Sequence, residues 1–204
     1  MLASGHQAMG ITWGVASITA ISSTLPFSLQ SEKEYIGYFF AIMIGSLLPD
    51  MDSMKSKMGR YMYSIASILV IGLIGFFLVD SERFWSWINA EAIFLLALII
   101  PVFFVFSSHR TWTHSLLFVA MLGIYFQLLS IWFTIPLYLQ MGCGIGVLSH
   151  IFGDFITKRG VPLFYPLHRK YYRFLFTFHT GSQAERGIVF SLVLANIWLL
   201  FTQV

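Results

Sequence analysis

Histidine and aspartate residues occur in a few short patches of this chain, and their types suit metal binding. The most informative pair is His150 and Asp154, in the segment SHIFGD. Residues four apart on a helix project from one face, about 6 Å from each other, so both side chains could bind one ion. Ionisable groups in an apolar helix are costly and indicate function, although a hydrogen bond that only ties helices together is the alternative.

The segment LLPDMD supplies two carboxylates, Asp50 and Asp52, directly after Pro49. In a turn, carboxylates with this spacing could bridge two metal ions, or one could hold a metal while the other holds a water molecule. The alternative is a solvated turn, in which aspartate is common. Cys143 is the single cysteine of the chain, which excludes a site of four thiolates. Any metal must therefore be held by imidazole and carboxylate groups.

The segment SHRTWTHS contributes His109, Arg110 and His114. The two histidines are five apart and do not share a helical face, so we expect His109 on a loop and His114 in the first turn of a helix capped by Thr111 or Thr113. The guanidinium of Arg110 is a fork-shaped donor suited to phosphate or carboxylate. Alternatively, these residues only extend from the membrane interface toward water.

Two weaker candidates are His6, near the N-terminus, and Glu185, in GSQAER. His168 and His179 lie in the basic and aromatic stretch HRKYYRFLFTFHT, which we interpret as an interfacial segment. Its aromatic and basic side chains can rest at lipid headgroups and attract anionic lipid, so neither histidine is predicted to bind the metal.

The elements that must position these residues are predicted to be membrane helices. The chain has 204 residues, of which 57% are hydrophobic and 10% charged, whereas a soluble domain carries roughly 25% charged residues. We therefore expect one all-α domain over residues 1–204: a polytopic transmembrane bundle of about seven helices, with the basic and aromatic segment 158–186 on the cytoplasmic side. The expected spans are 9–27, 35–49, 61–79, 92–107, 112–135, 137–157 and 187–203.

The number of spans between the patches places them on one membrane face. Two spans separate each of the first three patches from the next, and none separates the fourth, SHIFGD, from the fifth, GSQAER, so the chain returns to the same side each time. Lysine and arginine are concentrated on that side, which carries ten of the 12 basic residues. The positive-inside rule makes this side cytoplasmic. The sequence thus predicts a metal site at the cytoplasmic face.

In their order along the chain, several motifs resemble the YdjM-like family of membrane-bound metal-dependent hydrolases: Gly5-His6, LLPDMD, HRTWTHS, GVLSHIFGDFITKRGVPLFYP and GSQAER. This resemblance covers most of the chain and implies a multi-pass protein of the bacterial inner (cytoplasmic) membrane. The HxxxD pair is also similar to the helix motif of the zinc-dependent phospholipase C and single-strand nuclease group. That similarity implies two or three Zn²⁺ ions, with Asp154 bridging. The implied metal ligands are His6, Asp50, His109, His114, His150, Asp154 and Glu185.

The leading hypothesis is hydrolysis of a phosphoester in a membrane lipid, such as a phospholipid or a polyprenyl phosphate, with no nucleic-acid partner. Asp50 or Asp52 would orient or deprotonate the attacking water, and Arg110 would neutralise charge on the phosphate. An alternative is a transporter or ion pathway that uses the same buried His and Asp residues as a relay. A third possibility is a structural membrane protein whose polar cluster only packs helices.

Overall fold

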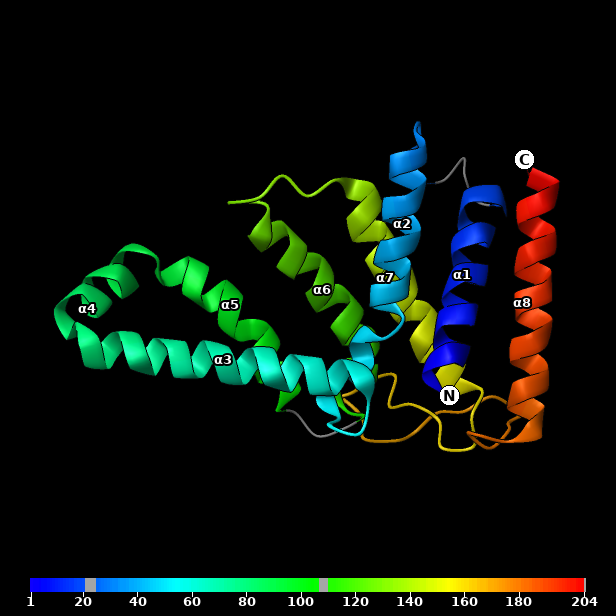
Figure 1. Ribbon diagram of the computed structural model, residues 1–204. Helices are drawn as coiled ribbons and strands as arrows, with labels where there is room; N and C mark the ends of the chain where they lie inside the picture. The colour runs from blue at the N-terminus through cyan, green and yellow to red at the C-terminus, as the bar shows by residue number, and fades with distance from the viewer. Residues whose placement is uncertain (21–24, 107–109, 204) are drawn as a thin grey trace. The chain divides into compact units, whose positions relative to one another are not determined.

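The computed structural model describes residues 1–20, 25–106 and 110–203, and within these ranges the chain is helical, with no β-strand (Figure 1). This confirms the all-α class. The described helices are α1 (Ala3–Ala20), α2 (Glu32–Gly45), α3 (Lys57–Val79), α4 (Ser81–Ala90), α5 (Ala92–Val105), α6 (Leu116–Leu129), α7 (Leu137–Phe155) and α8 (Gln183–Gln203), together with the 3-10 helices η2 (Leu48–Asp52) and η3 (Trp112–His114).

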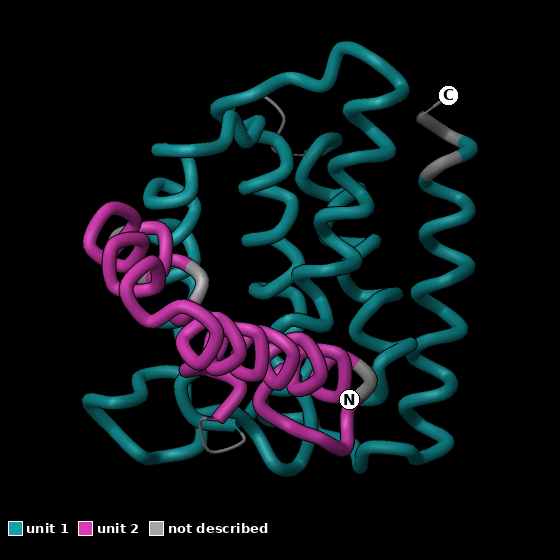
Figure 2. The backbone as a smooth tube through the Cα atoms, turned by 60° about the vertical axis from the view of Figure 1, so that its left-hand side comes forward, with its two compact units in different colours: residues 1–49, 110–204 teal, residues 50–109 magenta. Residues whose placement is uncertain are grey.

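The chain divides into two compact units, coloured separately in Figure 2. Unit 1 comprises residues 1–49 and 110–204, and unit 2 comprises residues 50–109. The expectation of one domain over the whole chain stays a prediction.

Unit 1 is built around α7, which packs against α1, α2 and α6, while α8 packs against α1 (Figure 1). Glycines allow the close approach of α2 and α7. A Cβ atom on Gly146 would lie 2.3 Å from the carbonyl oxygen of Ile42, and one on Gly45 would lie 2.2 Å from that of Cys143. Small residues of this kind let helix backbones approach closely, as they do in membrane helix pairs. By contrast, Gly144 has no atom within 4 Å of its hypothetical Cβ.

Unit 2 consists of α3, α4 and α5, which pack against one another. Ser56 caps α3 by accepting a hydrogen bond of 2.8 Å from the backbone nitrogen of Gly59, and Asp80 caps α4 through Arg83 in the same way at 2.9 Å. The predicted spans include no helix at α4. The reason is that α4 is short and polar on one side, with Glu82 and Arg83 in its first turns, whereas the span pattern detects only apolar segments.

Within the described ranges, Met58–Val79 of α3 is the one helical stretch both long and apolar enough to cross a membrane, with 22 residues and a mean hydropathy of 2.4. Helices α2, α5 and α6 have 14 residues each, and at 1.5 Å per residue each is about 21 Å long, against a hydrocarbon core of about 30 Å. Helices α1 and α7 are longer, but they carry the polar residues of the candidate site. The seven-span bundle is therefore not confirmed.

Candidate metal centre

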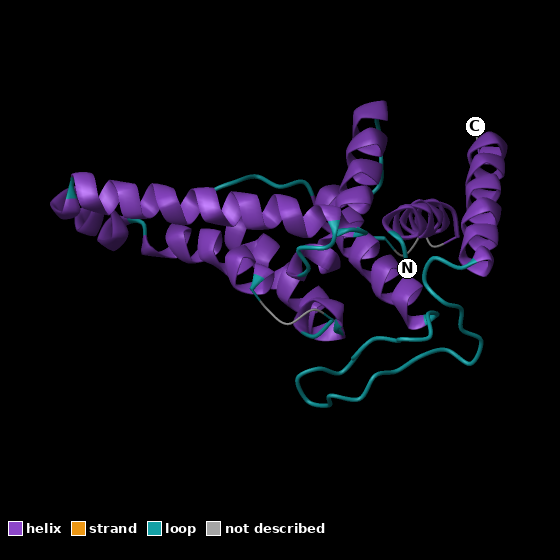
Figure 3. Ribbon diagram, turned by 60° about the horizontal axis from the view of Figure 1, so that its bottom comes forward, coloured by secondary structure: helices purple, strands orange, loops and turns teal. Residues whose placement is uncertain are grey.

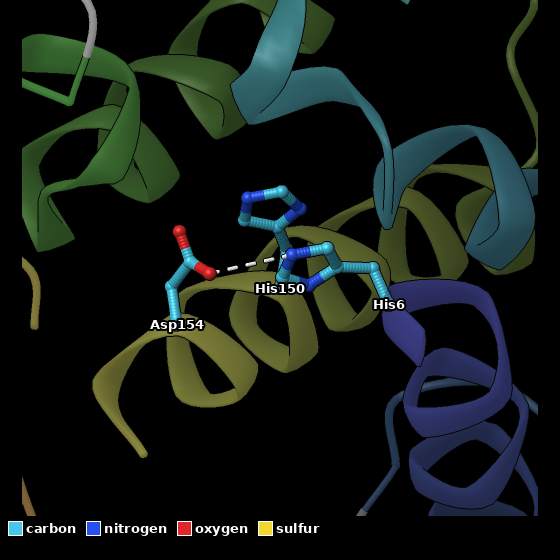
Figure 4. Close-up of side chains that lie close together, drawn as sticks. All are labelled: His6, His150 and Asp154. Atoms are coloured by element: carbon cyan, nitrogen blue, oxygen red, sulfur yellow. Dashed lines mark ion pairs between the residues drawn. The ribbon is translucent and has the colours of Figure 1, made fainter. Parts of the chain in front are cut away.

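Helices α1 and α7 bring three of the predicted ligands together. His6 lies in the second turn of α1, and His150 and Asp154 lie one turn apart at the end of α7 (Figure 4). Each residue offers a ligand atom within 4.8 Å of those of the other two. All three are at most 1% exposed. The predicted pairing of His150 with Asp154 on one helical face is confirmed, and His6 completes a buried group of two imidazoles and one carboxylate.

The orientation of His150 is fixed from α2. Its Nδ1 lies 2.7 Å from the carbonyl oxygen of Ser46, the residue that follows the last turn of α2. Because a carbonyl oxygen can only accept, this Nδ1 carries a proton and donates it. The neutral ring then presents a lone pair on Nε2. Metal-binding histidines almost always make such a hydrogen bond through the other ring nitrogen.

His114 extends the group to four residues, called the His–Asp cluster below: His6, His114, His150 and Asp154. Its Nε2 lies 3.3 Å from Nε2 of His150 and 3.6 Å from Oδ2 of Asp154. Its Nδ1 lies 2.9 Å from Oγ1 of Thr113. His114 ends η3 rather than lying in the first turn of α6. Ser115 caps α6, so the predicted cap at Thr111 or Thr113 is wrong.

Positively charged groups and hydrogen-bond donors surround the carboxylate of Asp154. Its Oδ1 faces Nε2 of His6 at 3.4 Å and also contacts the amino nitrogen of Met1, while its Oδ2 lies 2.5 Å from a terminal guanidinium nitrogen of Arg110. A buried carboxylate is stable only when it is paired and hydrogen-bonded. The donors that surround Asp154 meet this requirement.

Arg110 is held in a strained backbone conformation. Its φ angle is +60°, in the left-handed region, which costs a non-glycine residue roughly 1–2 kcal/mol. The side chain is nearly buried, and besides Asp154 it donates to the carbonyl oxygen of Gly160 at 3.2 Å. Strain of this kind persists where the surroundings fix the residue, often at functional sites.

Two atoms of the cluster are buried without a hydrogen-bond partner within the described residues: Nδ1 of His6 and Oδ2 of Asp154. Oδ2 of Asp154 still forms ion pairs with Arg110 and His114, so Nδ1 of His6 is the one available as a ligand. The His6 ring stacks on the His150 ring, with 3.6 Å between the centroids and 9° between the planes. Two protonated rings at this distance would repel each other, whereas two neutral rings can bind a cation. The donor set and the unpaired nitrogen therefore fit a divalent metal ion.

Comparison with known proteins gives the family. The model of the family described as YdjM inner membrane protein matches residues 1–204. The chain belongs to the YdjM family. It is 27% identical over 201 residues to the inner membrane protein YdjM of Escherichia coli (strain K12) and to that of Shigella flexneri, covering 98% of this chain and 83% of each relative. No solved structure matches. The family membership inferred from the sequence motifs is confirmed.

In this YdjM family member, Glu185 also lies at the cluster end of unit 1. Its buried carboxylate accepts hydrogen bonds from the backbone nitrogens of Leu2 and Gly181, each at 2.6 Å. It thereby ties the beginning of α1 to the beginning of α8. As a metal ligand, Glu185 stays a prediction. The start of α1, the end of α7 and the start of α8 meet at one end of unit 1 (Figure 1).

Three further site residues predicted from the sequence remain predictions. Asp50 and Asp52 belong to unit 2, and their roles stay predictions. His109 lies outside the described residues. Ser46 acts through a backbone oxygen, so its side-chain type gives no signal in the sequence. Thr113 was considered only as a helix cap, although its place beside His114 could have suggested the hydrogen bond to that ring.

Proposed function

We propose that this YdjM family member is a metal-dependent hydrolase, embedded in the bacterial inner membrane by several helices, that cleaves a phosphoester of a membrane lipid at the cytoplasmic face. The observation that carries the proposal is the convergence of His6, His150 and Asp154 within 4.8 Å, all buried, with one imidazole nitrogen unpaired. The family description as an inner membrane protein supports the placement, as does the apolar stretch Met58–Val79.

Zinc is the metal that the cluster fits best. Zinc binds imidazole nitrogen and carboxylate oxygen, and catalytic zinc sites commonly have three protein ligands. His6, His150 and Asp154 would hold one ion, and His114 lies close enough to both His150 and Asp154 to serve a second. A total of two or three ions remains part of the proposal. Zinc would supply Lewis acidity, which makes water nucleophilic near neutral pH and polarises phosphoryl oxygens.

The protein's own residues would orient the ligands and bind the phosphate. Ser46 and Thr113 hold the His150 and His114 rings through their Nδ1 atoms. Arg110 presents its guanidinium at Oδ2 of Asp154, where its fork of donors could also pair with a phosphoryl oxygen and stabilise the charge that develops there. The assignment of Asp50 or Asp52 as the residue that orients or deprotonates water rests on the sequence and stays a prediction.

A groove beside Glu185 fits a lipid substrate. It has a volume of about 310 Å³ and is lined by Leu2 and by the apolar residues Val189, Phe190 and Val193 of α8, with Arg186 among them. Leu2 follows Met1, whose nitrogen contacts Asp154, so the groove begins next to the His–Asp cluster. A groove lined by apolar side chains and one cation suits an acyl or prenyl chain attached to a phosphate, although Ser4 and Glu185 also line it.

Metal content tests the first requirement. The protein purified in detergent without chelators should contain at least one zinc ion per chain by mass spectrometry of the metals. His150→Ala and Asp154→Ala should lose it. The matched control is His168→Ala, since His168 is exposed and lies outside the cluster. Circular dichroism and size-exclusion profiles would verify folding. Full zinc content in both site variants would remove the basis of the proposal.

Lipid turnover tests the reaction. The zinc-loaded protein in mixed micelles should release a phosphorylated product from a phospholipid, or inorganic phosphate from a polyprenyl phosphate. A chelator should abolish the activity, and zinc should restore it. If reconstituted liposomes instead show ion flux through the protein without turnover of any lipid, the transporter alternative would replace the hydrolase.

A further inference from the structure

The loop between α7 and α8, residues 156–182, is not used by the proposed chemistry, and its charge is one-sided. It forms a long trace without regular secondary structure in Figure 3. There is no acidic residue between Asp154 and Glu185. All five basic residues of the loop are exposed: Lys158, Arg159, Arg169, Lys170 and Arg173. The loop therefore presents a positive surface with no carboxylate of its own to neutralise it.

Large apolar side chains stand among these charges. Leu167 is 84% exposed, Leu175 is 90% exposed and Phe176 is 83% exposed. Exposed apolar side chains that cluster together mark an interaction surface. Basic residues interspersed with exposed leucine and aromatic side chains form the composition that binds the headgroup layer of a membrane.

Backbone hydrogen bonds order the loop, and some of its side chains are buried while others are exposed. Val161 and Tyr172 exchange two backbone hydrogen bonds of 2.9 and 2.8 Å, and the backbone nitrogen of Lys158 donates to the carbonyl oxygen of Phe178 at 3.0 Å. Val161 and Phe178 are themselves buried. These contacts order the loop itself. Two others join it to the neighbouring helices: the backbone nitrogen of Leu116 donates to the carbonyl oxygen of Leu163 at 2.9 Å, and that of Phe174 donates to the carbonyl oxygen of Phe155 at 3.0 Å.

The loop also contacts the arginine of the candidate metal centre. The hydroxyl of Tyr171 donates to the carbonyl oxygen of Arg110 at 3.1 Å, and the Arg110 side chain donates to the carbonyl oxygen of Gly160 at 3.2 Å. The same guanidinium pairs with Asp154. The loop is therefore connected to the His–Asp cluster through Arg110.

We propose that loop 156–182 is a docking platform for the surface of an anionic lipid leaflet. Leu167, Leu175 and Phe176 insert among the headgroups, and the basic residues named above pair with lipid phosphates. The contacts with Arg110 then hold the candidate metal centre at the depth of the headgroup phosphates. This inference rests on the membrane placement proposed above and does not depend on the hydrolytic reaction.

Depth measurements with a spin label test the platform. The full chain carrying Cys143→Ala would be labelled at Leu175→Cys and reconstituted in nanodiscs of phosphatidylcholine, alone or mixed with phosphatidylglycerol. The ratio of oxygen to nickel-chelate accessibility at this label should rise several-fold when phosphatidylglycerol is present. The control is a label at Lys33→Cys, an exposed site on α2 outside the loop, which should show no such dependence.

Charge-reversal variants test whether the basic side chains of the loop are what draws it to anionic lipid. Arg169→Glu, Lys170→Glu and Arg173→Glu, combined in the Leu175→Cys protein, should abolish the rise caused by phosphatidylglycerol. These side chains are exposed, so the change does not disturb the core. A Leu175 label that stays accessible to the nickel chelate in both kinds of disc would overturn the platform. Immobilisation by added single-stranded RNA alone would do the same, and would assign the surface to nucleic acid.

Zinc content measured on the same samples distinguishes the two proposals. A water-exposed loop in a protein that retains zinc would reject the platform and leave the hydrolase standing. A loop inserted in the lipid of a protein that binds no zinc would do the reverse.

Discussion

The imidazole of His6 lies parallel to that of His150, with 3.6 Å between the ring centroids. His6 lies near the start of α1 and His150 lies near the end of α7, so the stack depends on the packing of these two helices. Nδ1 of His150 is held by Ser46, while Nδ1 of His6 is unpaired within the described residues. Within the stack, the orientation of the His150 ring is therefore fixed more firmly than that of the His6 ring. The position of the His6 ring is the one to change by mutation.

Gly153 sets the position of the His6 ring. A Cβ at this position would lie 3.1 Å from Nδ1 and 3.4 Å from Cε1 of His6. Gly153→Ala should therefore push the ring by a few tenths of an ångström and weaken zinc binding about tenfold, the lower end of what second-shell changes cost. The control, Gly144→Ala on the same helix, meets nothing within 4 Å and should bind zinc as the parent does. Competition with a fluorescent chelator measures both affinities, and equal affinities would contradict this role of Gly153.

The hydrogen bond between Thr113 and His114 makes a second prediction. Thr113→Val keeps the shape of the side chain and removes the partner of Nδ1. We expect zinc affinity to fall roughly 10- to 100-fold, because the partner fixes the tautomer and the ring orientation. Thr12→Val is the matched control, since it removes a hydrogen bond to Asn196 in the contact of α1 with α8. If the zinc affinity of both variants falls by the same factor, the cause is a general loss of stability, and Thr113 has no specific role in orienting His114.

Sequence alone could predict the class of the fold and the end of the helices at which the polar residues meet. Helical spacing predicted that His150 and Asp154 share one face, because this depends only on the period of the helix. The number of expected spans predicted that His6, Arg110 and His114 lie at the same end, because this depends only on whether that number is even. The apolar pattern could not reveal α4, whose residues are polar. Nor could it predict lengths, since α2, α5 and α6 are each 14 residues long.

The contacts within the site could not be predicted from the sequence, for a different reason. The pairing of Arg110 with Asp154 depends on the left-handed backbone at Arg110 and on the approach of loop 156–182, which are tertiary effects. The sequence indicated that the guanidinium of Arg110 suits a phosphate or a carboxylate, and the structure places it against the carboxylate of Asp154. Of the four glycines of α7, Gly142, Gly146 and Gly153 have close neighbours and Gly144 does not. Which face of a helix is covered cannot be read from glycine content.

Backbone strain at Arg110 gives a third prediction. Arg110→Gly and Arg110→Ala both remove the guanidinium that pairs with Asp154, so both should be destabilised. Only glycine adopts a φ of +60° without steric cost. After allowance for the greater flexibility of glycine in the unfolded chain, Arg110→Gly should be the more stable of the two by about 1 kcal/mol. Unfolding in mixed micelles of increasing denaturing detergent measures the difference, and a more stable Arg110→Ala would show that this residue is not strained.

Zinc should stabilise the folded protein through the His–Asp cluster. A ligand that binds only the native state adds about 2.7 kcal/mol at a free concentration of 100 times its Kd. Zinc added to chelator-treated protein should therefore raise the midpoint of thermal unfolding, and the chelator should reverse the rise. Asp154→Asn removes a carboxylate that lies within 4.8 Å of both His6 and His150, so this variant should respond weakly or not at all. His168→Ala should respond as the parent does, because its side chain is exposed and outside the cluster. Magnesium at the same concentration should have little effect, since it prefers oxygen ligands in octahedral geometry and the cluster offers mainly imidazole nitrogen. A parent protein that zinc does not stabilise would mean that the buried imidazoles and carboxylate serve helix packing alone.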